Sequence, residues 1–101
     1  MMHHRPHVEK HTVAAIAVAL DFDLGFKPVY VKIVNVTKKR TLEWYAGMAD
    51  ASAFILKEGA SDIFSPALVT QKGVTPSDYG FSLGVETSIN VATDVLYILA
   101  L

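Results

Sequence analysis

GFKPVYVKIVNVTKKRTLEWYAGM, which spans residues 25–48, is the stretch of this chain that decides the fold. Pro28 has a fixed φ and no backbone N–H, so it suits the first residue of a strand. The residues after it are mostly β-branched, and their side chains alternate between two faces. After a polar turn at 35–40 the alternation resumes and places Leu42 and Trp44 on one face. The stretch therefore predicts a β-hairpin with Trp44 in the core.

The rest of the chain carries the same period in shorter segments, which glycine, proline and polar turn residues separate. Residues 71–80 contain strong turn signals and are expected to form a loop, whereas residues 51–56 fit either a strand or a helical turn. About seven or eight short antiparallel strands predict an all-β fold, a compact and jelly-roll-like β-sandwich or barrel. The other expected strands are 12–24, 62–65, 67–70, 80–85 and 93–101.

The segment 12–24 has two competing interpretations. Its alanines also fit a helix, and a charged start before a short apolar run also fits a secretory signal. Glu9 lies in the wrong region for such a signal, and the alternation continues beyond any cleavage point into Phe22 and Leu24. We therefore expect one long strand, and the apolar run is far too short to span a bilayer.

Length and composition indicate one folded domain, residues 12–101, preceded by a flexible arm, residues 1–11. Hydrophobic residues make up 51% of the chain and the mean hydropathy is +0.33, which excludes a disordered protein. The formal net charge of −1 excludes a broad basic field for nucleic acid. Cysteine is absent, so disulfides and thiolate chemistry are excluded. The apolar excess predicts that part of the surface packs against other subunits.

The arm contains all four histidines of the chain, His3, His4, His7 and His11. Histidines can ligate a transition metal, but no histidine or carboxylate cluster elsewhere completes a site, so these four are weak metal candidates. We expect instead that the arm, including Arg5, contacts a partner and becomes ordered on binding.

The pentapeptide 80–84 matches the G-x-S-x-G string of hydrolases, with Ser82 at its centre. The hydrolase motif requires a strand–turn–helix context and a later histidine, and no histidine follows His11. Asp21 and Asp23 could bind a hard cation, but a solvated strand end explains them more simply. The sequence therefore predicts neither an enzyme nor a cofactor.

Surface contacts are expected at further places. Lys38, Lys39 and Arg40 form a basic triplet at a turn, which either meets an acidic partner or is simply solvated. Tyr45 is expected to be half exposed and available to a partner, on the face opposite to Trp44. Subunit contacts are assigned to two apolar strand faces, Val13-Ala15-Ala17-Ala19 and, in the terminal strand, Leu96-Ile98-Ala100.

Five short motifs follow one another along the chain. They are Gly25-Phe26-Lys27-Pro28, the strand Val31–Thr37 ending in Asn35-x-Thr37, Glu43-Trp44-x-x-Gly47-Met48, Gly73-Val74-Thr75 and Gly80-Phe81. Together with the apolar terminal strand, they resemble small structural proteins of tailed bacteriophages. The resemblance covers residues 22–101 and leaves the histidine-rich arm unmatched.

This resemblance implies a β-rich component of the virion, made in the host cytoplasm and without catalytic positions. The implied role is a capsid decoration or cement protein, a homo-oligomer and specifically a trimer, which binds the major capsid protein and stabilises the assembled head. The alternative is a tail-fibre or tail-spike accessory module that binds a carbohydrate or receptor through Trp44, Tyr45 and the turn at 38–40. Neither role involves nucleic acid or a membrane.

Overall fold

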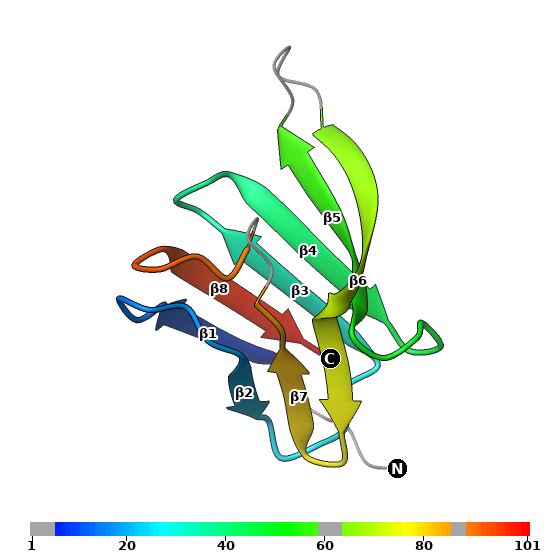
Figure 1. Ribbon diagram of the computed structural model, residues 1–101. Coiled ribbons are helices and arrows are strands. Elements are labelled where there is room, and N and C mark those ends of the chain that lie inside the picture. Colours follow the sequence, from blue (N-terminus) through cyan, green and yellow to red (C-terminus); the bar gives the residue numbers. More distant parts are fainter. Residues whose placement is uncertain (1–5, 59–63, 86–88) are drawn as a thin grey trace.

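The computed structural model describes the backbone of residues 6–58, 64–85 and 89–101. Within these ranges the chain is all-β, and eight strands form a single sheet (Figure 1). The fold class predicted from the sequence is confirmed. The strands are β1 (His7–Thr12), β2 (Leu20–Asp23), β3 (Tyr30–Asn35), β4 (Arg40–Tyr45), β5 (Ser52–Glu58), β6 (Phe64–Ser77), β7 (Gly80–Leu83) and β8 (Val95–Ala100).

The strands lie in the order β1-β8-β3-β4-β5-β6-β7-β2, and all neighbours pair antiparallel. The sheet curls into a half barrel, so a single curled sheet is observed rather than a two-sheet sandwich (Figure 1). β1 and β2 form its two edges. Between them the ring of His11 packs edge-on against the ring of Phe22, with 5.6 Å between the ring centroids. Among the described residues β1 and β2 do not pair by backbone hydrogen bonds, so the two edges are joined by this side-chain contact.

β3 and β4 form the predicted hairpin. The register pairs Tyr30 with Tyr45 and Asn35 with Arg40, so the turn lies where the sequence placed it. The tryptophan of β4 is 2% exposed, which confirms it as a core residue. The alternation of β-branched and polar residues was sufficient to predict this part of the fold.

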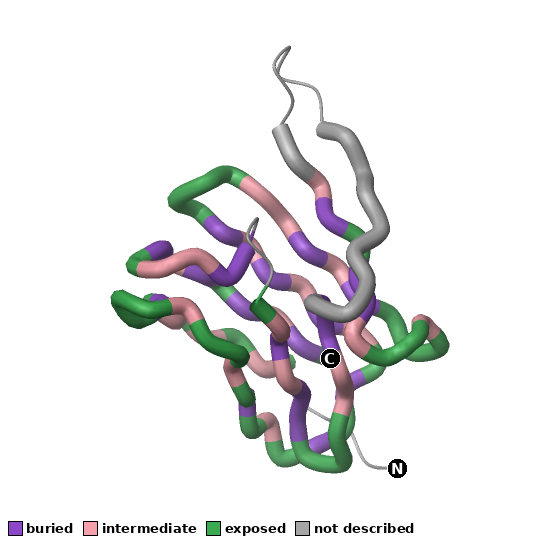
Figure 2. The backbone as a smooth tube through the Cα atoms, in the orientation of Figure 1, coloured by how far each residue is buried: buried purple, intermediate pink, exposed green. Residues whose placement is uncertain are grey.

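Apolar side chains fill the inside of the curled sheet because side chains alternate between its two faces along the central strands. Inward residues of the central strands are almost fully buried, whereas outward residues are half or fully exposed (Figure 2). Burial of apolar surface, worth roughly 25 cal/mol per Å², is the main stabilising contribution. The core residues are Val13, Phe22, Phe26, Val31, Ile33, Leu42, Trp44, Ala53, Ile55, Val74, Phe81, Leu83, Ile89, Leu96, Ile98 and Ala100.

β6 differs most from the sequence prediction. Short strands and a loop over 71–80 were expected, but one strand of 14 residues continues to Ser77. Its first part pairs with β5 and its last part with β7, and the register shifts between Ser52 and Ala53. At this crossover a Cβ on Gly73 would clash with the backbone carbonyl group of Ser52. Gly73 therefore permits a close backbone approach, which the sequence analysis had interpreted as a turn signal.

Both prolines of β6 lie where the strand has a single described neighbour. Pro66 lies opposite Leu56 of β5, and Pro76 lies opposite Phe81 of β7. A proline at such a position need not remove a ladder hydrogen bond, so it does not end the strand. Of the strand expected at 62–65, residues 62 and 63 lie outside the described residues.

The other short segments follow the predictions more closely. The segment 51–56, which the sequence left open between strand and helix, belongs mostly to β5. The strands expected at 80–85 and 93–101 are β7 and β8, each shorter than its prediction. In these three segments strand type was therefore read correctly from the sequence wherever it was assigned, and only the ends were misplaced.

The structure corrects two predictions for the N-terminal region. His7–Thr12 forms β1 and pairs with β8 along its whole length, so these residues are not a flexible arm. Residues 13–19 form a loop instead of the first half of a long strand, and Ile16 is 77% exposed there. Among the described residues no strand pairs with residues 13–19, although their sequence alternates. The next strand, β2, begins at Leu20.

Buried polar side chains tie together the loops at one end of the barrel. The Nδ2 group of Asn35 donates to the carbonyl oxygen of Ile89 at 2.8 Å and to Oδ2 of Asp94 at 2.9 Å. The Nδ2 group of Asn90 donates to the carbonyl oxygen of Val18 at 2.7 Å. These hydrogen bonds fix the loops against one another. The loops are 13–19, 36–39 and 89–94, and we call them together the loop end.

Candidate functional site

The outward side of β1, β8, β3, β4 and β5 carries many apolar and aromatic side chains. Val8 is 69% exposed, and Tyr97, Tyr45 and Phe54 are 44%, 45% and 44% exposed. The described part of the chain places no second layer over them. We define the outer apolar face as Val8, Val34, Tyr45, Phe54, Tyr97 and Leu99.

The strand register makes this face continuous. Tyr97 lies between Lys10 and Val34, and Leu99 lies opposite Val8. Side chains at such cross-strand positions are in contact, because their Cβ atoms are only about 5 Å apart. Five strands spaced by about 4.8 Å and six residues rising by about 3.3 Å give a face of about 24 by 20 Å. A face of this size can supply much of the roughly 800 Å² per partner that a standard protein interface buries.

Two tyrosines and a glutamate form one corner of this face. The rings of Tyr30 and Tyr45 are 5.2 Å apart between centroids. Both hydroxyl groups donate to Oε2 of Glu43, at 2.6 Å from Tyr30 and 3.2 Å from Tyr45. Burial, and then the hydrogen bond and charge of Glu43, raise the pKa of Tyr30 well above its usual value. Desolvation and the same carboxylate also raise the pKa of Tyr45.

The basic triplet and the tyrosine corner do not form one site. Lys38 and Lys39 are exposed in the turn of the loop end, and Arg40 is half-buried at the start of β4. Tyr45 lies at the other end of the same strand, five residues and about 16 Å away. Trp44 is buried and therefore not available to a carbohydrate, whereas Tyr45, the other aromatic residue of that interpretation, is exposed.

Leu96 and Ile98, which the sequence analysis assigned to subunit contacts, lie in the core. They are 0% and 1% exposed because β8 is an inner strand between β1 and β3, and their side chains point into the barrel. The outward residues of the same strand are Tyr97 and Leu99. The contact surface of β8 is therefore the opposite face from the one expected.

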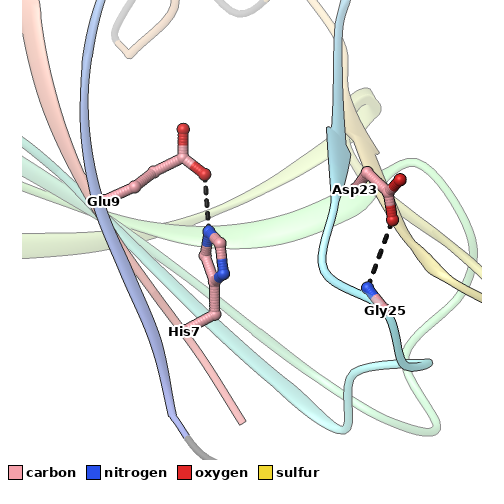
Figure 3. A network of polar contacts seen from close by, with 4 residues as sticks. All are labelled: His7, Glu9, Asp23 and Gly25. Atoms are coloured by element: carbon pink, nitrogen blue, oxygen red, sulfur yellow. Dashed lines mark hydrogen bonds and ion pairs between the residues drawn. The ribbon is translucent and has the colours of Figure 1, made fainter.

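The histidines within the described residues do not gather. Nε2 of His7 and Oε1 of Glu9 are 2.5 Å apart on the inward side of β1 (Figure 3). His11 packs on Phe22. No group of three or more histidine, aspartate or glutamate side chains that could hold a metal occurs in the described part of the chain. Outside the described residues lie His3, His4 and Arg5.

A hollow of about 270 Å³ lies along the paired strands β2 and β7. Its lining includes Asp21, Asp23 and Ser82, and the register places Asp21 opposite Ser82. Oδ1 of Asp23 accepts a hydrogen bond from the backbone N–H of Gly25 at 3.2 Å (Figure 3). Histidine is absent from the described lining, so Ser82 has no adjacent imidazole base there.

A second hollow, of about 340 Å³, lies between the loops 27–29 and 46–50. Pro28, Trp44, Met48 and Pro76 give it an apolar wall, and Lys27 and Asp50 also line it. The indole N–H of Trp44 has no hydrogen-bond acceptor among the described residues. Trp44 therefore carries one unmatched buried donor. The loops that line this hollow lie at the same end of the sheet as the turn 78–79 between β6 and β7. We call the loops at this end, 24–29, 46–51 and 78–79, the hollow end.

No family model, curated protein or solved structure matches this chain. The resemblance to phage structural proteins therefore stays a prediction. Among the described residues, no helix is long and apolar enough to cross a membrane.

The sequence analysis identified only Tyr45 among the residues of the outer apolar face. A signal for two others was present in β8, where core and surface residues alternate. Once Leu96 and Ile98 are placed in the core, Tyr97 and Leu99 must point outward. The pairing of β1 with β8, which brings Val8 onto the same face, had no signal in the sequence because the strands are about 85 residues apart.

Proposed function

We propose that this chain is a non-enzymatic structural protein that associates with copies of itself through the outer apolar face. The supporting observation is the exposure of Val8, Tyr45, Phe54 and Tyr97 on one continuous sheet face. Fully burying one such side chain contributes about 1.5–3 kcal/mol, so covering four half-exposed ones supplies several kcal/mol to association. Lys10, Lys32 and Glu43 lie among these side chains on the same side of the sheet, so the proposed contact combines apolar and charged groups.

The setting we propose is the phage virion, where the oligomer acts as a capsid decoration or cement protein. A protein that binds the assembled head and not its free subunits stabilises the assembly by mass action. A symmetric oligomer, a trimer in our proposal, offers several equivalent contacts to a symmetric shell and gains avidity from them. This role requires surfaces and a rigid scaffold, and it requires no catalytic group.

The virion setting is tested on phage particles whose genome encodes the chain, purified from a bacterial strain that supports their growth. We expect an antibody against the protein to label intact phage heads by electron microscopy. A control antibody against an unrelated cytoplasmic protein of the same strain should give no label. Purified particles that lack the protein by mass spectrometry would rule out a virion component.

A tail module that binds carbohydrate is the second candidate, and the tyrosine corner favours it. Tyr30 and Tyr45 supply stacked aromatic rings beside the carboxylate of Glu43, and sugars bind to such groups by stacking and hydrogen bonding. Binding on a glycan array that Tyr45→Ala removes, and that Tyr79→Ala leaves unchanged, would support this role. Absence of any glycan signal would leave the corner as part of the self-association face.

A further inference from the structure

The loop end presents apolar side chains to solvent on loops that are held in place. Ile16, Val18 and Val36 are 77%, 53% and 44% exposed. Beneath them lie Asn35 and Asn90, which are buried and whose side chains bind the loops together. Polar residues inside and apolar residues outside invert the usual arrangement, and such an inversion on ordered loops is typical of a contact surface.

The backbone also connects these loops into one surface. The N–H of Thr93 donates to the carbonyl oxygen of Ala14 at 3.2 Å, and the N–H of Val36 donates to that of Val95 at 3.1 Å. The apolar side chains are therefore presented together with Lys38 and Lys39 of the adjoining turn. Within the described residues, the loop end has no exposed carboxylate, because Asp94 is 3% exposed.

The hollow end has the complementary properties. Its hollow of about 340 Å³ has an apolar wall to which Trp44 contributes. Three exposed carboxylates lie around this end, those of Asp23, Asp50 and Asp78. Among the described residues 23–29, 46–51 and 78–79, Lys27 is the one exposed cation. The backbone N–H groups of residues 24 and 25 donate to the carbonyl oxygen of Tyr79, so the carboxylate-bearing segments lie together.

We propose that the loop end of one copy docks on the hollow end of a second copy, head to tail. Ile16, Val18 and Val36 supply the apolar contact with the hollow, while Lys38 and Lys39 face Asp50 and Asp78. Docking of two identical ends is disfavoured, because it would bring lysine against lysine or aspartate against aspartate. The contact is heterologous, so it closes into a ring or continues as a filament. It uses neither the outer apolar face nor the virion setting, and it stands independently of both.

Charge reversal tests the pairing directly. All variants carry Tyr97→Asp, which removes association through the outer apolar face, and circular dichroism checks that each remains folded. We expect sedimentation velocity at low salt to show association of this background that weakens at high salt. Lys38→Glu with Lys39→Glu, or Asp50→Lys with Asp78→Lys, should each weaken self-association about tenfold or more. An equimolar mixture of the two reversed variants should restore association with 1:1 stoichiometry.

The control is Asp21→Lys, which reverses an exposed charge in the edge strand β2, outside the loops of both ends. This control should leave head-to-tail association within about twofold of the background. Monomers at every concentration in the background variant would overturn the proposal. So would a mixture of reversed variants that associates no better than either one alone, or a control that weakens association as much as the end variants.

Discussion

The two faces of the curled sheet are built from the same strands and obey the same alternation, yet they have different tasks. On the inner face Val31, Ile33 and Leu42 are 0% exposed and belong to the apolar core. On the outer face Tyr97 and Val8 are 44% and 69% exposed, with charged residues between them. The inner face therefore determines folding, and the outer face is available for association. Substitutions should separate these two roles.

The largest expected difference is in stability. Leu42→Ala leaves a cavity in a fully buried site and should lower the free energy of unfolding by about 2–5 kcal/mol. Val8→Ala on the outer face should change it by no more than about 0.5 kcal/mol. Urea unfolding at a fixed protein concentration measures both values. Equal losses for the two variants would mean that the outer face also contributes to folding of the single chain.

Substitution of Gly80 tests how closely the edge strand β2 must pack against β7. A Cβ at this position would lie within clashing distance of the carbonyl oxygen of Phe22, so Gly80→Ala must push β2 away from β7. We expect a loss of about 2–4 kcal/mol in the free energy of unfolding. Ser82→Ala, in the same strand, should cost less than about 1 kcal/mol. Wild-type stability in Gly80→Ala would show that the edge strand can move freely.

Asn35 tests the polar closure of the core at the loop end. Asn35→Ala leaves Asp94 buried without its donor at 2.9 Å and should cost about 1–3 kcal/mol. Lys38→Ala is the matched control, because it keeps the backbone N–H that donates to Oδ1 of Asn35. It should change stability by no more than about 0.5 kcal/mol. A neutral Asn35→Ala would mean that the loops hold together without this network.

The smallest expected effect is the pH dependence that arises at the tyrosine corner of the outer face. The pKa of Tyr30 is raised in the folded state, so this residue contributes stability that is complete below pH 10 and is lost as the pH rises further. The slope for one residue is at most about 1.4 kcal/mol per pH unit. Tyr30→Phe should remove this part of the alkaline loss, and Glu43→Gln should lower the pKa of Tyr30. Identical alkaline stability curves for wild type and Tyr30→Phe would contradict the assignment.

Alternation along the sequence predicted strand type and the β3–β4 hairpin correctly, because both depend on near neighbours. It misjudged β6, where Gly73 and Pro76 carry turn signals but lie in a strand that changes partners. It also misjudged β1, because pairing with β8 joins opposite ends of the chain and leaves no local signal. The contact residues were harder still. Leucine and isoleucine occur both in interfaces and in cores, so the identity of Leu96 and Ile98 does not distinguish the two. The position of β8 between β1 and β3 places them in the core.

The mass of the protein in solution tests the central claim most directly, that the outer apolar face joins copies of this chain. Size exclusion with light scattering is carried out at high salt, which suppresses the head-to-tail contact. We predict about 33 kDa for the wild type, three times the chain mass of 11.0 kDa. Tyr97→Asp should reduce the mass to that of one chain, and Tyr79→Asp, an exposed tyrosine in a turn outside this face, should leave it unchanged. A wild-type protein that elutes as a single chain at every concentration would contradict the account.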